Sequence, residues 1–245
     1  MLARDPVEAV EQAKSFMATH SLSDYCDEVV RPALILAQKD VERGVLDEGK
    51  TRIMHEDVDT LFIDLAHEHW VSKKEAHAAT LTPATKLPLL EKDQLTLNWR
   101  SKEPLVSIGV HSKLDESAAV VMATLMQIHG IATRMDSPEA LGAAKLAKLD
   151  LSGAALICLS SIDMRTPAHI HYAARRLKSR APHAKLLLGV WSAIDDKALT
   201  DLKEAINADY VARTFHQAAA IVLEQATLGR RTEANIQPTL TAKSG

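Results

Sequence analysis

The sequence predicts a doubly wound α/β fold, because residues 105–211 alternate between short apolar segments and helical ones. Five segments are too short and too uniformly apolar for half-exposed strands and suit a parallel sheet covered on both faces. They are Leu105–Val110, Ile131–Met135, Ala154–Ser160, Lys185–Val190 and Asp209–Val211. Helical segments alternate with them at 114–129, 138–148, 167–180 and 195–207, and a last helix follows at 214–228. A right-handed βαβ series of this size gives a flavodoxin-like sheet of five parallel strands.

An N-terminal bundle of three amphipathic helices is predicted for residues 1–80. The helices begin at Asp5-Pro6, at Ser21 or Ser23, and near Leu46, where capping residues precede apolar positions at helical spacing. Pro32 lies inside the second helix, so we expect a kink or a break there. Uninterrupted spacing predicts that this helix buries Leu22, Cys26, Val29, Ala33, Leu36 and Ala37.

Residues 81–103 have no sustained hydrophobic period and are expected to form a linker between two domains, the bundle at 1–80 and the α/β domain at 104–229. Leu95, Leu97 and Trp99 alternate within this linker, which predicts either an added edge strand or packing against a neighbouring domain. Residues 230–245 are polar and are expected to form a flexible tail.

Composition excludes several classes of protein. No apolar run reaches the roughly 18 to 20 residues that span a bilayer, and no signal-peptide pattern is present, so the expected location is the cytoplasm. The two cysteines, Cys26 and Cys158, cannot form a disulfide framework or a multi-cysteine metal site. Residues 1–80 carry a net charge of −7 and the remainder +4, which is too little positive charge for a nucleic-acid footprint.

A small ligand of such a fold is expected in the crevice beyond the carboxyl ends of the central strands. Side chains that follow strands there are His111 and Ser112, the pair Ser160 and Ser161, and the pair Trp191 and Ser192. These residues form a predicted binding pocket. Serines at a strand end are usually ordinary turn residues, and that alternative stays open at this point.

Common catalytic and cofactor motifs are missing. One glycine follows the first strand where a dinucleotide fingerprint needs three, and there is neither P-loop spacing nor a G-x-S-x-G elbow. In His67-Glu68-His69 the histidines are two residues apart, so on a helix they point to different faces and cannot share one metal ion. His169 and His171 have the same spacing. We therefore expect no catalytic centre and no metal site.

The sheet region resembles cobalamin-binding domains, which also place a helical bundle before a flavodoxin-like sheet. That family has a D-x-H-x-x-G motif after its first strand, and the position of its ligating histidine falls here on Asp115. Ser160 matches a family serine after the third strand, and Gly189 keeps half of a glycine pair after the fourth. The resemblance implies a cobalamin-like ligand in the crevice that is not bound through the usual histidine.

Nearly the whole chain resembles the soluble C-terminal region of bacterial membrane proteins of the autoinducer-2 exporter family, the PerM-type permeases. The similar segments are Asp5–Ala13, Asp27–Leu34, Arg43–Asp47, Leu114–Ala119, Leu149–Gly153, Cys158–Ser160, Pro167–Leu177 and Leu188–Trp191. This resemblance implies a non-catalytic regulatory or sensory module of a transporter at the inner face of the membrane, which binds a small ligand or a partner protein. A homodimer is a further prediction, although the sequence does not indicate its interface. The alternative is a cofactor-binding protein or enzyme that uses His111, Ser160 and Trp191.

Overall fold

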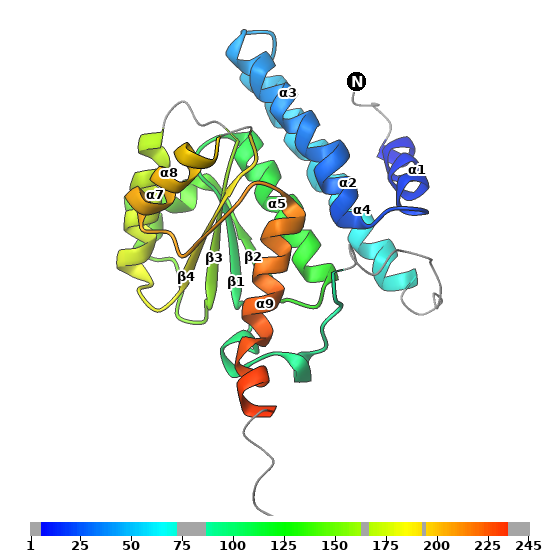
Figure 1. Ribbon diagram of the computed structural model, residues 1–245. Coiled ribbons are helices and arrows are strands. Elements are labelled where there is room, and N and C mark those ends of the chain that lie inside the picture. The colour runs from blue at the N-terminus through cyan, green and yellow to red at the C-terminus, as the bar shows by residue number, and fades with distance from the viewer. Residues whose placement is uncertain (1–5, 73–86, 163–166, 193–194, 235–245) are drawn as a thin grey trace, which may run out of the picture.

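The computed structural model describes residues 6–72, 87–162, 167–192 and 195–234. Its centre is a five-stranded sheet in which all strands are parallel, in the order β2-β1-β3-β4-β5 (Figure 1). The strands are β1 (Leu105–Gly109), β2 (Thr133–Asp136), β3 (Leu156–Ser161), β4 (Lys185–Val190) and β5 (Tyr210–Ala212). The predicted flavodoxin-like fold is therefore confirmed, and this strand order is the flavodoxin order.

Helices cover both faces of the sheet (Figure 1). Helices α5 (Lys113–Ile128) and α9 (Phe215–Ala234) pack on one face, and α6 (Ala143–Leu146), α7 (Pro167–Arg180) and α8 (Asp196–Ile206) on the other. Alternate strand residues supply the two cores. Leu156 and Cys158 of β3 face α5, whereas Ile157 and Leu159 face α7. Burial on both faces is why these strands are uniformly apolar.

One helix of the α/β region departs from its prediction. The segment at 138–148 is a 3-10 turn, η4 (Pro138–Leu141), followed by the short α6, because Gly142 between them has an extended backbone with ψ of 146°. The last helix, α9, continues to Ala234, so the first five residues of the predicted tail, 230–234, are helical. The remainder of that predicted tail lies outside the described residues.

The N-terminal region consists of α1 (Pro6–Met17), α2 (Leu22–Tyr25), the π-helical turn η1 (Cys26–Val30), α3 (Arg31–Glu42) and α4 (Glu48–Ser72). The break expected at Pro32 is this π turn, which ends just before the proline. A π turn holds more residues than an α turn, so the side chains that follow it point to a different side of the helix than uninterrupted α-helical spacing predicts. As a result Leu34 is buried, whereas Val29 and Leu36 of the predicted apolar face are 40% and 57% exposed.

The predicted linker packs against the rest of the protein over its described residues, 87–103. It forms two 3-10 turns, η2 (Lys92–Gln94) and η3 (Leu97–Trp99), and contains no strand in that range. Leu95 and Trp99 are buried, and Leu97 is 81% exposed. Because helix α4 packs along α5, one apolar core extends from the bundle through this segment to the sheet. No described helix is long and apolar enough to cross a membrane.

Candidate functional site

The crevice predicted from the sequence lies where β1, β3 and β4 end. Strand register places Gly109 beside Ser160, and Ser160 beside Gly189. A Cβ atom at position 109 would lie 2.6 Å from the backbone nitrogen of Glu116, so the glycine lets the first turn of α5 approach the strand. Two glycines that flank a serine therefore create a narrow space above the sheet, on the side of α5 and α9.

The side chain of Trp191 fills this space. A Cβ atom on Gly189 would lie 2.1 Å from Cζ2 of the Trp191 ring, so the indole covers the glycine directly. The indole also stacks on Phe215 of α9, with ring centroids 4.1 Å apart and planes inclined by 18°. Neither ring is exposed to solvent. The crevice is thus closed by the protein's own aromatic side chains.

Three buried polar atoms at these strand ends have no hydrogen-bond partner among the described residues. They are the hydroxyl oxygens of Ser160 and Ser192 and the indole nitrogen of Trp191. Burial raises the pKa of the neighbouring Cys158 thiol to about 12, although the Ser160 hydroxyl acts to lower it. The thiol is therefore neutral and is at best a weak partner for that hydroxyl. Each unsatisfied group costs about 1–3 kcal/mol in a folded protein.

Asp115 and Ser112 shape the loop at the mouth of the crevice. The Asp115 carboxylate accepts backbone N–H bonds from His111 at 3.1 Å, Ser112 at 3.0 Å and Ile162 at 2.7 Å. The Ser112 hydroxyl accepts from the Asp115 backbone and caps α5. Burial raises the pKa of the Asp115 carboxyl, while these donors oppose the rise. Both side chains connect the end of β1 to α5 and β3 and are not free to bind a ligand.

Among the predicted site residues, His111 alone is exposed. Ser160, Ser161, Trp191 and Asp115 are buried, Gly189 is covered and Ser112 is half-buried. The ring of His111 lies against that of His169 at the start of α7, with centroids 4.0 Å apart. Sequence reasoning missed this pair because 58 positions separate its members. No cluster of three metal ligands occurs among the described residues; Glu68 and His69 of the rejected motif have side chains outside them.

A polar cluster joins α4 to α5 beside the crevice. Glu116 is buried and accepts from the Lys113 ammonium group at 2.5 Å, and His55 Nε2 lies 3.8 Å from its other oxygen. His55 Nδ1 is 3.1 Å from the Ser117 hydroxyl. This order imitates a serine–histidine–carboxylate triad, but Ser117 is unexposed and donates its proton to the Lys113 carbonyl at 3.0 Å. The cluster therefore connects the bundle to the sheet and holds no available nucleophile.

A second connection joins the bundle to the start of α9. The Asp27 carboxylate accepts from the backbone N–H groups of Phe215 at 2.7 Å and His216 at 3.0 Å. The Ser23 hydroxyl also lies 3.0 Å from Nδ1 of the His216 ring. Asp27 thus serves as a helix cap supplied from a distant segment, in a position that also favours negative charge. Residue Phe215 is the one that stacks on Trp191.

These features define a flavodoxin-like α/β protein with a docked helical bundle and a closed crevice at its strand ends. Neither a family model nor any curated protein matches the sequence. Among solved structures, a cobalamin-binding protein from Desulfitobacterium hafniense DCB-2 aligns with a TM-score of 0.39 at 11% identity, over 90% of this chain and 92% of its own. Similarity this low carries no argument about a ligand. The permease resemblance has no support from any family match and stays a prediction.

Proposed function

We propose that this protein is a non-catalytic sensory module that binds a small ligand rich in hydrogen-bond acceptors at the carboxyl ends of β1, β3 and β4. The proposal rests on the three unpaired polar atoms of Ser160, Trp191 and Ser192. Hydroxyl and indole groups can donate to carboxylate, phosphate or carbonyl oxygens. A ligand that entered this space would satisfy them and recover the free energy that their burial costs.

Binding requires Trp191 to move, because its ring occupies the space above Gly189. The affinity measured for the resting protein is then the intrinsic affinity multiplied by the fraction of molecules in which the ring has moved. His111, in the loop after β1, is exposed, and its ring lies against that of His169 at the start of α7. The sequence-based alternative, a cofactor-binding protein or enzyme, would use His111, Ser160 and Trp191 around its ligand.

The ligand signal would reach the bundle through α9. Displacing Trp191 removes the ring on which Phe215 stacks, and the backbone N–H of Phe215 donates to Asp27 of the bundle. Ligand binding and the Asp27 cap therefore compete for the position of one residue. In a transporter or another parent assembly, this coupling would convert occupancy of the crevice into a change in bundle docking.

Native and denaturing mass spectrometry of freshly purified protein, with a visible absorption scan, is the first test. A mass excess that disappears on denaturation identifies a retained ligand, and colour identifies a cobalamin-like one. A thermal-shift panel of carboxylates, phosphorylated metabolites and cobalamin follows, on the wild type and on Trp191→Ala, in which the crevice is open. A ligand at about 100 times its dissociation constant stabilises the protein by about 2.7 kcal/mol.

The proposal predicts that an active compound stabilises the wild type and that Ser160→Ala, which removes one donor, weakens its binding. Trp191→Ala opens the crevice but also removes the indole donor, so it shows only whether a compound enters the space. The proposal also predicts faster hydrogen exchange at the Phe215 and His216 amides when ligand is bound. If neither protein retains or responds to any member of the panel, the crevice is not a ligand site. Binding without the exchange change would reject the relay and leave the binding site standing.

A further inference from the structure

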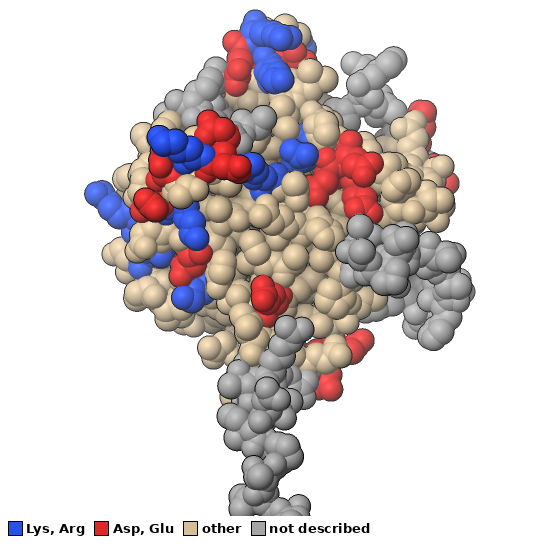
Figure 2. Space-filling model, in the orientation of Figure 1, with Lys and Arg blue, Asp and Glu red and all other residues tan. Residues whose placement is uncertain are grey.

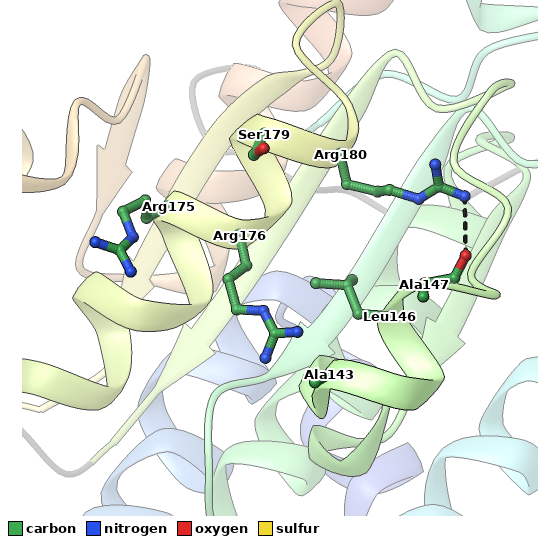
Figure 3. Close-up of a pocket in the computed structure, with 7 residues that line it drawn as sticks. All are labelled: Ala143, Leu146, Ala147, Arg175, Arg176, Ser179 and Arg180. Atoms are coloured by element: carbon green, nitrogen blue, oxygen red, sulfur yellow. Dashed lines mark hydrogen bonds between the residues drawn. The ribbon is translucent and has the colours of Figure 1, made fainter.

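A basic groove runs between α6 and α7, on the face of the sheet opposite the bundle. It has a volume of about 450 Å³ and is lined by Ala143, Leu146, Ala147, Arg175, Arg176, Ser179 and Arg180 (Figure 3). Figure 3 shows Arg176 and Arg180 extending from α7 toward α6, with Leu146 between them, and Arg175 projecting from the other flank of α7. These seven residues are called the α7 surface below.

Three arginines give the α7 surface its positive charge. Helix α7 contains Arg175, Arg176, Lys178 and Arg180 and no carboxylate. Lys178 pairs with Asp209 at 3.3 Å. Arg176 and Arg180 instead donate to the backbone carbonyls of Leu141 and Ala147, each at 3.1 Å. Within the described residues, none of the three arginines has a carboxylate at ion-pair distance, although hydrogen bonds from Ser152, helped by the Arg180 charge, lower the pKa of the Asp150 carboxyl.

Helix α4 presents the complementary chemistry on the other side of the molecule. Ile53 and Ile63 are 52% and 59% exposed, and the exposed acidic residues Glu56 and Asp57 lie between them. Spacings of three, seven and ten residues place Ile53, Glu56, Thr60 and Ile63 along one side of the helix. From 52 to 67 the helix has four carboxylates and one basic residue, Arg52, which pairs with Glu56 at 2.9 Å, so Glu56 would have to exchange this partner and Asp57 supplies the further negative charge. Residues 53, 56, 57, 60 and 63 are called the α4 stripe.

We propose that this protein associates head to tail with itself, the α4 stripe of one copy lying in the α7 surface of the next. Exposed isoleucines would cover the apolar floor around Leu146, and Glu56 and Asp57 would pair with the arginines. Figure 2 shows blue Lys and Arg atoms beside red ones on the α7 and α8 side of the molecule; most of α4 lies behind α3 in this view (Figure 1). Opposite charges on opposite sides favour this arrangement over a twofold dimer.

The contact is heterologous, so repetition gives rings or open chains instead of a closed pair. One shallow groove against one helix is small compared with a stable interface, so the association is weak and electrostatic in character. It should therefore grow with protein concentration and decline with salt. The proposal does not depend on the crevice or on its ligand.

Sedimentation velocity tests this over about 5 to 500 μM protein, the range expected for a small interface, in about 50 mM and about 500 mM salt, which screen surface charges to different extents. The wild type should form larger species at high concentration and low salt. Arg175→Glu with Arg180→Glu should weaken association by about tenfold or more, as should Glu56→Arg with Asp57→Arg. Combining all four changes in one chain exchanges the charges and should restore association.

Lys92→Glu with Lys197→Glu is the matched control for the arginine pair. It lowers the net charge by the same amount as Arg175→Glu with Arg180→Glu, at exposed positions outside both surfaces. Circular dichroism and a thermal melt confirm that every variant folds. Ile63→Ser removes an apolar contact without changing charge and should also weaken association. A wild type that stays monomeric throughout, or a four-residue exchange that fails to restore association, overturns the proposal. Equal loss in the control would likewise overturn it, since net charge would then explain the effect.

Discussion

Gly189→Ala tests the packing that closes the crevice. The added Cβ would lie 2.1, 2.6 and 2.7 Å from three atoms of the Trp191 ring, Cζ2, Cη2 and Cε2. The ring cannot slide freely, because it is fully buried and stacks 4.1 Å from Phe215. The protein must therefore either strain the strand and the ring together or expel the ring from the crevice.

The two responses differ in cost. Overpacking of a core costs about 1–3 kcal/mol. Expelling a buried aromatic side chain of about 150–250 Å² forfeits up to about 4–6 kcal/mol at about 25 cal/mol per Å². Strain is the cheaper response, and alanine in a strand regains about 0.5–1 kcal/mol relative to glycine. We expect Gly189→Ala to lower the free energy of unfolding by about 2 kcal/mol.

A double-mutant cycle with Trp191→Ala isolates the contact. The free energy of unfolding is measured by urea denaturation for the wild type, both single variants and the double variant. Removal of the indole takes away the three atoms nearest to the added Cβ, so in the Trp191→Ala background Gly189→Ala should be neutral or stabilise by about 0.5 kcal/mol. Equal losses in both backgrounds would show that Gly189 is required for another reason and that Trp191 does not cover it.

Three further predictions concern individual groups. Asp27→Ala should cost about 1–2 kcal/mol and speed hydrogen exchange at the start of α9, whereas Asp195→Ala, which removes the cap of α8, should cost about 1 kcal/mol and leave that exchange unchanged. Burial acts to raise the pKa of the Asp209 carboxyl, but hydrogen bonds and two lysines outweigh it and lower that pKa below 3.8. Its charge thus stabilises the fold above the ordinary pKa, so Asp209→Asn should lower stability at neutral pH, and urea titrations should show the difference vanishing as the pH falls through the lowered pKa. Burial raises the pKa of both Cys26 and Cys158, so neither thiol should react with a disulfide reagent until urea unfolds the protein, and rapid labelling of the folded protein would contradict their burial.

The fold could be predicted from the sequence because a parallel sheet covered on both faces requires continuous apolar strands. Strand β4 and helix α7 have the predicted boundaries, Lys185–Val190 and 167–180. The errors arise where local geometry interrupts a period. The π turn before Pro32 shifts the buried face of the helix that follows, and Gly142 divides a segment that otherwise has the pattern of one helix.

The location of the candidate site could be predicted from the sequence, but the closure of its crevice by Trp191 could not. Parallel strands end at one edge of the sheet, so residues that follow them, such as Ser160 and Trp191, had to lie near one another. Whether Trp191 faces solvent or the sheet depends on Gly189 and Phe215 together, and no local pattern encodes that choice. The Asp27 cap on α9 joins residues 188 and 189 positions apart, which a single sequence cannot reveal.

The closed crevice has a feature that stability alone does not explain. A phenylalanine at position 191 would bury no unpaired N–H, and an alanine at position 160 would remove a second unpaired group at little cost in volume. Retaining Trp191 and Ser160 leaves the resting protein less stable by roughly 1–3 kcal/mol for each group. A ligand that pairs with both groups reverses this cost, and so gains affinity from the strain of the unliganded state. On this argument Trp191→Phe should both stabilise the free protein and weaken ligand binding. If the indole only fills space, the substitution should not produce these two effects together.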